Sequence, residues 1–316
     1  ARSDHTCPVK IAVIDIGTNT VLLLLAEISD EGRVRPLLHE QRIPRLGRGV
    51  DATRRLRKES IDRVIQVLKE YLKLLLPYHP VSTVLCGTSA LRDASNRADF
   101  TGIVQRELGL VVEVLTGEDE ALLTYRGALS GLSGVQRAIV LDIGGGSTEI
   151  SAGDASHVQL KWSLDIGSVR LTERFFRHDP PTSEEIEEAT LWVRGELRKL
   201  TGFDGSGATL IGVAGTATTL AFLDQGLEDF SVEAISNYRL SREAVEGLFT
   251  RLKGLSHAEL LRLTPVMRGR ADIIAGGTLV LKEVMDATGR DELIVSERGV
   301  RYGIALREWQ KQIGKS

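Results

Sequence analysis

Two similar phrases, each an apolar run that ends in Asp-Ile-Gly, constrain this chain more than any other feature of its sequence. The first is VIDIGTNTV at residues 13–21, and the second is VLDIGGGSTEI at residues 140–150. An apolar run of this length predicts a buried β-strand, and a following glycine lets the backbone turn and approach a ligand closely. Since both phrases precede a similar series of elements, the sequence predicts an internal domain duplication.

The hydrophobic periodicity predicts the order β-β-β-α-β-α in each half. In the first half we expect strands at 10–16, 20–28, 33–40 and 81–86, with helices at about 56–76 and from about 89. In the second half we expect strands at 138–143, 148–152, 157–164 and 208–214, with helices at about 168–177, 183–200 and from 215. The later chain predicts helices at about 241–253, 256–263 and 266–288, a strand at 292–296, and a last helix near 298–313.

The predicted fold class is therefore α/β, with two domains built alike around mixed sheets. We expect the first domain to comprise residues 1–125 plus about 305–316, and the second to comprise residues 126–304. Two such domains should face each other across a cleft, which is the usual place for a small-molecule site.

The composition excludes several classes of protein. The chain has 316 residues, of which 42% are hydrophobic and 26% charged, as expected for about two globular domains. No stretch approaches the roughly 20 apolar residues of a membrane span, and the first ten residues lack the apolar core of a signal peptide. Cys7 and Cys86 form neither a disulfide framework nor a CxxC pair. We expect a cytoplasmic protein.

Each Asp-Ile-Gly loop has the composition of a phosphate site. Consecutive N–H groups in a glycine-rich turn form a nest for an anion, and hydroxyl or amide side chains add donors: Thr18, Asn19, Thr20, Ser147 and Thr148. An aspartate at the head of the loop would repel a bare phosphate, but a divalent cation such as Mg²⁺ can bridge the two. The alternative is a tight hairpin that merely needs glycine.

Residues 33–58 form a strongly basic segment within a chain whose net charge is −3. The segment holds eight arginines and one lysine against two acidic residues, Glu40 and Asp51. Arginine suits bidentate phosphate recognition. Two interpretations stay open: part of the segment faces phosphate, or the segment is a solvated basic face.

Several motifs together resemble a known family. The paired loops on duplicated domains resemble the acetate kinase, sugar kinase, Hsp70 and actin superfamily. Within it, DIGGGSTE, TGEDEA at 116–121, GTSALRDA at 87–94 and SERGVRYGIA at 296–305 resemble the exopolyphosphatase/guanosine-pentaphosphate phosphatase (Ppx/GppA) family. The resemblance runs from about residue 10 to 306, and it implies two ribonuclease H-like (actin-like ATPase) domains.

The chain departs from the family pattern in a few places. Thr18 and Thr20 stand where serine is common, and Asp119 stands where glutamate is common. The resemblance is to a short form, without the C-terminal HD-like region of larger members.

The resemblance implies a role for individual residues. Glu120 would orient or deprotonate the attacking water, although its position alone favours an acidic first turn that caps a helix, together with Thr116. Asp142 and Glu149 would bind Mg²⁺ or another divalent cation, with Asp15 as a second or water-mediated ligand. The transferring phosphoryl group would be held by backbone N–H groups of Gly144, Gly145, Gly146 and Ser147.

Further phosphate contacts are expected from Thr18, Asn19, Thr20, Arg45, Thr88 and Arg92. Either arginine could instead pair with Asp93 or Glu40. The stretch AGTATTL at 214–220 fits either a helix N-terminus that faces phosphate or close packing of a helix on a strand. Arg301 is a further residue carried over from the family motif.

The function predicted from these residues is Mg²⁺-dependent exopolyphosphatase activity, with inorganic polyphosphate as substrate. Guanosine pentaphosphate is the alternative substrate. A small-molecule kinase or a non-catalytic phosphate or nucleotide sensor is the alternative from another class, although the chain shows no acceptor motif and keeps all three carboxylates, Glu120, Asp142 and Glu149. No nucleic-acid or membrane partner is expected, and a homodimer is implied by the resemblance only.

Overall fold

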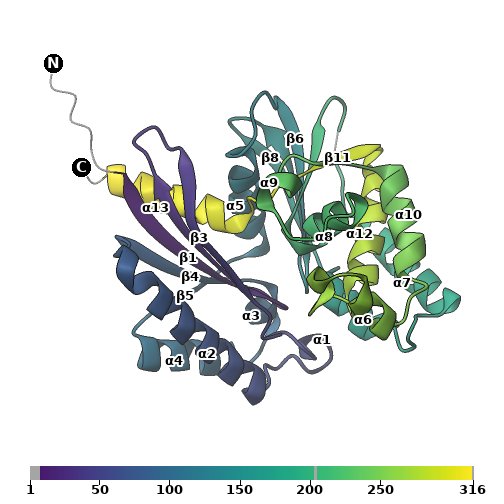
Figure 1. The fold of residues 1–316 in the computed structure, drawn as a ribbon, viewed down its shortest axis with the longest axis horizontal. Coiled ribbons are helices and arrows are strands. Elements are labelled where there is room, and N and C mark those ends of the chain that lie inside the picture. The colour runs from purple at the N-terminus through teal and green to yellow at the C-terminus, as the bar shows by residue number, and fades with distance from the viewer. Residues whose placement is uncertain (1–7, 203–204, 315–316) are drawn as a thin grey trace. The chain divides into compact units, whose positions relative to one another are not determined.

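The chain folds into two compact α/β units, which a computed structural model describes over residues 8–202 and 205–314. Unit 1 is the chain up to Ser130 together with the chain from Val300 on, and unit 2 is Gly131–Gly299. In Figure 1 the strands of unit 1 are purple to blue, and β6 and β8 of unit 2 are teal. Cys7 lies outside the described residues. Within these residues, no helix is long and apolar enough to cross a bilayer.

Unit 1 is built on a five-stranded mixed sheet with the order β3-β2-β1-β4-β5. β1 pairs antiparallel with β2 and parallel with β4, while β5 extends the parallel part. The strands are β1 (Val9–Ile16), β2 (Val21–Ile28), β3 (Val34–Arg42), β4 (Ser82–Gly87) and β5 (Val112–Val114). The helices are α1 (Val50–Thr53), α2 (Lys58–Leu75), the 3-10 turn η1 (Leu76–Tyr78), α3 (Ser89–Asp93), α4 (Arg97–Leu108), α5 (Gly117–Leu129) and α13 (Val300–Ile313).

The central strand β1 is apolar at nearly every position because both of its faces are covered. Alternate residues of a strand point to opposite faces. Ile14 packs into the cluster formed with α2 and α4, whereas Val13 packs into the cluster formed with α5 and α13. Tyr302 of α13 is fully buried in the second cluster. The last helix of the chain is therefore part of the core of unit 1.

Unit 2 has a six-stranded mixed sheet with the order β10-β11-β9-β6-β7-β8. Its strands are β6 (Arg137–Ile143), β7 (Thr148–Asp154), β8 (Val158–Leu164), β9 (Thr209–Val213), β10 (Arg239–Ser241) and β11 (Glu292–Val295). Its helices are α6 (Ser168–Phe175), α7 (Ser183–Leu197), α8 (Ala214–Asp224), α9 (Val232–Ile235), α10 (Arg242–Leu252), α11 (His257–Leu263), the 3-10 turn η2 (Pro265–Met267) and α12 (Ile274–Thr288).

Helix α12 is the centre of the helical layer of unit 2, and its sequence fits that place. Most of its residues are buried, and its first eight, Ile274 to Leu281, include no charged side chain, as expected of a helix segment in a core. A Cβ added to Gly277 would lie 2.5 Å from Oγ1 of Thr216 on α8, so glycine is needed where the two helices meet.

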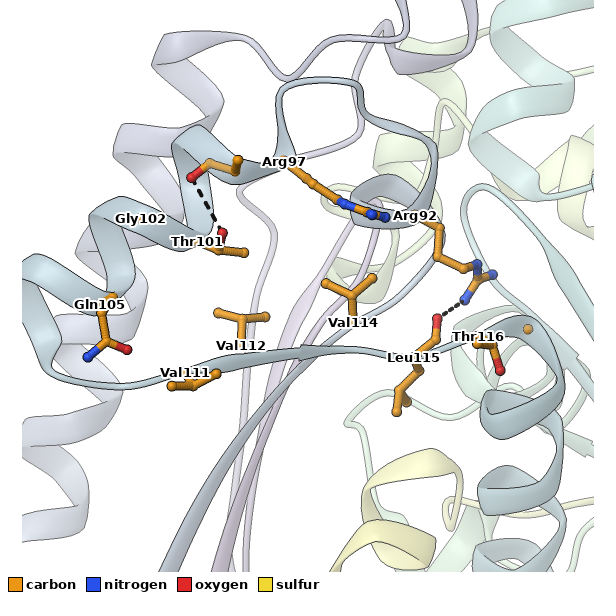
Figure 2. Close-up of a pocket in the computed structure, with 12 residues that line it drawn as sticks. Arg92, Arg97, Thr101, Gly102, Gln105, Val111, Val112, Val114, Leu115 and Thr116 are labelled. Atoms are coloured by element: carbon orange, nitrogen blue, oxygen red, sulfur yellow. Dashed lines mark hydrogen bonds between the residues drawn. The ribbon is translucent and has the colours of Figure 1, made fainter.

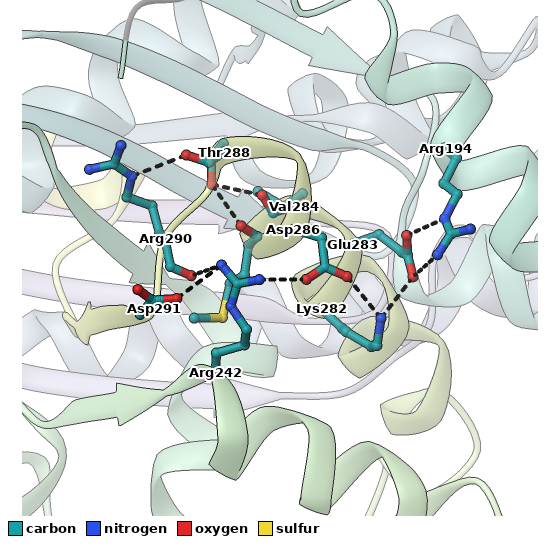
Figure 3. A network of polar contacts seen from close by, with 10 residues as sticks. Arg194, Arg242, Lys282, Glu283, Val284, Asp286, Thr288, Arg290 and Asp291 are labelled. Atoms are coloured by element: carbon teal, nitrogen blue, oxygen red, sulfur yellow. Dashed lines mark hydrogen bonds and ion pairs between the residues drawn. The ribbon is translucent and has the colours of Figure 1, made fainter. Parts of the chain in front are cut away.

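An ion network ties the polar face of α12 to its neighbours (Figure 3). Glu283, which is only 3% exposed, accepts a 2.6 Å hydrogen bond from Nε of Arg194 on α7. Arg242 of α10 bonds Asp286 at 3.0 Å, and Lys282 lies within hydrogen-bond distance of both carboxylates. Three helices are joined in this way, and a buried carboxylate receives the partners that it needs.

The structure confirms the predicted α/β class and the duplication. The order β8-β7-β6-β9-β11 in unit 2 repeats the order β3-β2-β1-β4-β5 of unit 1, and β10 adds an antiparallel edge strand beyond β11. The strands β5 and β10 were not predicted, because three residues are too few for a period of two to be recognised.

Two predicted helices were too long. The helix expected from 89 is interrupted between Asp93 and Arg97, because the side chain of Asn96 bonds both the N–H and the carbonyl of Leu56, at 2.8 and 3.1 Å. The helix expected at 266–288 begins only at Ile274, because Gly269 takes a left-handed conformation with φ of 77° and the chain turns there.

Candidate active site

The predicted site residues gather, within each unit, at one edge of the sheet. In unit 1 the parallel strands β1, β4 and β5 end near Asp15, Thr88 and Thr116, respectively. In unit 2, β6 ends at the loop 144–147, and its parallel neighbour β9 ends at Ala214. The carboxyl ends of parallel strands share one edge, where ligands of α/β sheets usually bind.

The glycine loop of unit 2 is held from behind by the beginning of α6. Backbone N–H groups of residues 168–170 donate to the carbonyls of Gly144 and Gly145 at 2.8 to 3.0 Å. In a planar trans peptide, the N–H of the next residue points opposite to the carbonyl. The N–H groups of Gly145 and Gly146 therefore point away from α6, which is the geometry of an anion nest.

Gly167 makes this close approach of α6 and the loop possible. Its φ of −144° is open to any residue, so its backbone does not require glycine. A Cβ at this position, however, would lie 2.5 Å from the carbonyl oxygen of Gly145 and 2.6 Å from the carbonyl carbons of Gly145 and Gly146. The loop geometry therefore depends on the missing side chain.

Asp142 and Glu149 lie directly opposite each other on β6 and β7. Directly opposed residues on antiparallel strands point to the same face, with Cβ atoms roughly 4.5–5.5 Å apart. Both residues are buried, at 8% and 2% exposure. In unit 1 the residue opposite Asp15 is Leu22, so the carboxylate pair belongs to unit 2.

Ser163 of β8 extends this row by one strand. It lies opposite Glu149, and its Oγ donates a 2.8 Å hydrogen bond to Oε1 of Glu149. The other carboxylate oxygen, Oε2, is buried and accepts no hydrogen bond from the described residues. Ser163 thus fixes the orientation of the Glu149 carboxylate.

This arrangement fits a magnesium ion. Two like charges on neighbouring buried carboxylates repel each other unless a cation lies between them. The described residues contain no group of three or more His, Cys, Asp or Glu side chains placed to hold a metal. Mg²⁺ does not need one, because it usually keeps several waters and takes one or two protein carboxylates plus phosphate oxygens.

The loop of unit 1 is built in the same way as that of unit 2. The N–H of Gly17 donates to the carbonyl of Thr20 at 2.9 Å, and the carbonyls of Thr18 and Asn19 accept from the N–H groups of Gly47 and Arg45 at 2.8 and 3.0 Å. By the same peptide geometry, the N–H groups of residues 19 and 20 point away from the 45–47 segment.

Arg45 contributes to this loop through its backbone. Its φ is 56°, in the left-handed region that a residue with a Cβ seldom adopts. This strained conformation places the N–H of Arg45 against the loop. Arg45 therefore supports the loop through its backbone, a role that the sequence, which suggested only its charge, did not predict.

Glu120 is distinguished from its acidic neighbours by burial. It is 7% exposed, whereas Glu118 and Asp119 are exposed. Thr116 is the N-cap residue of α5, and its Oγ1 accepts a 3.1 Å hydrogen bond from the N–H of Asp119. Nη1 of Arg92 instead donates to Oε2 of Glu120 at 2.5 Å and to the carbonyl of Leu115 at 3.2 Å. Helix capping therefore does not account for Glu120.

The two carboxyls of unit 1 are both shifted toward the protonated form. Burial raises the pKa of Glu120, against the opposing effect of the Arg92 charge. Burial, together with the negative charge of Glu120, raises the pKa of Asp15 to about 7, while the charge of Arg301 acts in the other direction. A carboxyl whose pKa is raised in this way is a suitable general base near neutral pH.

Arg92 also borders a groove of about 950 Å³ between α4 and β5 (Figure 2). Arg92, Arg97 and Thr116 line the groove toward α5, while Val111 and Gln105 line the opposite end. The groove is thus cationic at the end near Glu120 and mostly uncharged elsewhere. Thr88, buried at 6% exposure, precedes α3, the helix that carries Arg92.

Part of the basic segment is neutralised on the surface of unit 1. Among the described residues, ion pairs join several of its cationic side chains to carboxylates: Arg33–Glu31, Arg35–Glu27, Arg42–Glu40 and Glu70, Arg54–Asp93, and Lys58–Asp62. For Arg33, Arg35 and Lys58, whose paired side chains are mostly exposed, the solvated-face interpretation fits best. Arg54, which lies 3.6 Å from Asp93, stays a candidate for the phosphate-facing interpretation.

The structure adds residues that the sequence patterns did not single out. Ser163 donates a hydrogen bond to Glu149. Gly167 lets α6 approach the glycine loop, and Arg170 donates to the carbonyl of Gly146 in that loop. The guanidinium of Arg270 rests on Gly215 at the beginning of α8, next to Ala214, whose φ is 63°. The structure fits both interpretations of AGTATTL: α8 packs closely on α12, and its first turn lies beside the guanidinium of Arg270.

The sequence pattern around Gly167 and Arg170 gave little indication of their role. The letters Asp-Ile-Gly occur a third time at 165–167. There the aspartate is 74% exposed, so the triplet is not a third loop but the approach to α6.

Comparison with known proteins gives consistent results. The model of the Ppx/GppA phosphatase family matches residues 25–312. Exopolyphosphatase 2 of Mycobacterium tuberculosis is 39% identical over 313 residues, covering 94% of this chain and 98% of the relative. The crystal structure of the Aquifex aeolicus Ppx/GppA family member is 35% identical, with a TM-score of 0.81 over 96% of this chain and 98% of that one. An exopolyphosphatase structure from Cytophaga hutchinsonii is 28% identical, with a TM-score of 0.88 and coverage of 96% and 98%.

Proposed function

The chain belongs to the Ppx/GppA phosphatase family and is a hydrolase, and from this premise we propose that it is an exopolyphosphatase, which releases orthophosphate from the end of an inorganic polyphosphate. The observation that carries the proposal is Glu120, a buried carboxylate with a raised pKa that a neighbouring arginine holds in place. A water nucleophile needs a general base to accept its proton, whereas a phosphate sensor, which catalyses no reaction, does not. The polyphosphate substrate is inferred from the relatives that are named exopolyphosphatase.

In the proposed reaction, Glu120 orients the attacking water and accepts its proton. Arg92 keeps the carboxylate in one orientation and, by its charge, keeps the ionised form accessible despite burial. The phosphorus–oxygen bond to the rest of the chain breaks as the bond to water forms, and the shortened polyphosphate leaves with the electron pair.

The groups of unit 2 would hold the transferring phosphoryl. The N–H groups of Gly145, Gly146 and Ser147 would donate to its oxygens. The N–H of Gly144, which was also expected from the sequence to hold the phosphoryl group, instead donates to the carbonyl of Ser147 at 3.0 Å. Asp142 and Glu149 would hold Mg²⁺, which would neutralise charge on the phosphate. Asp15 would be a further, water-mediated ligand. In unit 1 we propose additional phosphate contacts from Thr18, Asn19, Thr20, Arg45, Thr88 and Arg92.

A second substrate, guanosine pentaphosphate, is favoured by the groove of unit 1. A nucleoside needs an apolar or aromatic surface for its base, and the valines on β5 and just before it provide one close to Arg92. A long polyanion would find few cations along the same groove. The groove therefore predicts that a nucleoside, if one is bound, lies over Val111 and Val112.

The decisive experiment measures Mg²⁺-dependent phosphate release from tripolyphosphate, long-chain polyphosphate, guanosine pentaphosphate and ATP in parallel. We expect the highest kcat/KM with a polyphosphate. A higher value for guanosine pentaphosphate would change the substrate and leave the mechanism intact. Transfer of phosphate only to an added acceptor, or no release from any substrate, would refute the hydrolase mechanism.

Two variants separate the substrate surfaces. Val111, which is 75% exposed, can be changed to Glu with little effect on the core, and V111E should raise the KM for guanosine pentaphosphate but not for tripolyphosphate. The double change Arg54→Ala and Arg55→Ala should raise the KM for long polyphosphate more than for tripolyphosphate, and more so at low salt, where screening is weak. Equal kinetics on long and short chains would place these arginines on a solvated face.

A further inference from the structure

Arg170, in the first turn of α6, makes a contact that no sequence motif indicated. Its Nε donates a 2.6 Å hydrogen bond to the carbonyl oxygen of Gly146. The residue is only 6% exposed. Nη2 of the same guanidinium lies 3.9 Å from Oδ1 of the exposed Asp165. Arg170 nevertheless differs from the ion-paired arginines of the basic segment, because it is buried and donates to a backbone carbonyl of the glycine loop.

The contact completes a series along the loop. The carbonyls of Gly144 and Gly145 accept hydrogen bonds from the backbone of α6, whereas the carbonyl of Gly146 accepts from the Arg170 side chain. Since each peptide is planar and trans, the third bond sets the direction of the N–H of Ser147. Three successive N–H groups then point to the same side, opposite α6.

The charge of Arg170 favours anion binding at the loop, as its hydrogen bond does. Its guanidinium lies behind the loop, next to the positive end of the α6 dipole. In a buried environment of low effective dielectric, a fixed positive charge stabilises a nearby anion more than it would in water. In the transition state of phosphoryl transfer, negative charge is spread over the equatorial oxygens that the loop would bind, so a fixed positive charge behind the loop stabilises them.

We propose that Arg170 is the positioning residue of the phosphoryl-binding loop, which it holds through the Gly146 carbonyl and supports with a buried positive charge. This inference rests on the proposed function of the loop. Arg170 does not touch the phosphoryl group in this account; it acts through the N–H of Ser147 and through its electrostatic field.

Three substitutions at position 170 separate the two contributions. Arg170→Gln keeps an N–H donor without the charge, Arg170→Lys keeps the charge without the planar guanidinium, and Arg170→Met removes both. We expect kcat to fall about 10²-fold in R170M, in the range for loss of one oxyanion-hole donor, with a smaller fall in R170K and R170Q. KM should change much less than kcat in all three.

The matched control is Arg174→Met on the same helix. Arg174 is exposed and lies over the ring of Trp192 at 4.6 Å, so this change removes an equal charge from α6 without touching the loop. R174M should keep kcat within about twofold. Equal losses in R170M and R174M, or wild-type kcat in R170M, would overturn the proposal.

A binding measurement tests the loop independently of turnover. Isothermal titration with orthovanadate and with orthophosphate, each with Mg²⁺, should show a larger affinity loss for vanadate than for phosphate in R170M, because vanadate mimics the transition state. An unchanged vanadate affinity would contradict the proposal even if wild-type protein hydrolyses none of the substrates tested. If R170M does not fold, the vanadate and phosphate affinities are compared in R170K and R170Q instead. Wild-type vanadate affinity in both variants would overturn the proposal.

Discussion

Replacement of Gly167 by alanine tests the loop geometry with the smallest possible change. The added Cβ would lie 2.6 Å from the carbonyl carbons of Gly145 and Gly146. Carbon atoms pack at about 3.5–4.0 Å, so either the loop or the beginning of α6 must move by roughly 0.9 Å or more. The backbone at Gly167 has a φ of −144°, so the substitution itself adds no strain in the Ramachandran sense.

The expected loss of activity follows from that displacement. A misplacement of about 1 Å at a reacting group can cost roughly 10²-fold in rate, equivalent to about 2.7 kcal/mol of transition-state stabilisation. Because α6 and the loop are joined by hydrogen bonds of 2.8 to 3.0 Å, movement of either partner disturbs the N–H groups. Overpacking should also lower the free energy of unfolding by about 1–3 kcal/mol.

The assay is kcat/KM for phosphate release, together with the unfolding midpoint in urea. Gly195→Ala is the control, because a Cβ at Gly195, within α7, meets no atom within 4 Å. This control should retain full activity and gain about 0.5–1 kcal/mol of stability. A folded G167A protein with kcat/KM within threefold of wild type would refute the claim that the loop requires this close approach.

The other predictions concern the carboxylates. Glu120→Gln should lower kcat by about 10²–10⁴-fold while equilibrium dialysis shows near wild-type polyphosphate binding; an equal effect of Glu118→Gln would remove the assignment. Asp142→Asn and Glu149→Gln should each raise the Mg²⁺ concentration needed for half-maximal activity, since each loses a charged ligand, and unchanged titrations in both would place the cation elsewhere. Because the pKa of Asp15 is raised to about 7, protons should compete with the cation there, so Mg²⁺ titrations should shift to higher concentration as pH falls through 7. A titration midpoint independent of pH would exclude Asp15 as a ligand.

Local patterns were enough to predict most of the framework. Glycine loops after apolar strands, and helices with apolar residues at regular spacing, depend on contacts close in sequence, so their positions were predictable from the printed residues. The same patterns predicted that Asp142 and Glu149 stand at a glycine loop. The three-residue strands β5 and β10 and the break at Asn96 were not predictable, because pairing partners and anchors distant in the chain decide them.

Tertiary structure decided which residues of each motif matter. Three consecutive acidic residues look alike in the sequence, and only packing shows that Glu120 is buried against Arg92 while the N–H of Asp119 bonds the N-cap residue Thr116. Likewise, the sequence contains eight arginines in one basic segment, yet the arginine that holds the glycine loop is Arg170, outside that segment. Burial and hydrogen bonding between elements distant in sequence are properties of the folded chain, and they set the pKa values and orientations on which the proposed chemistry depends.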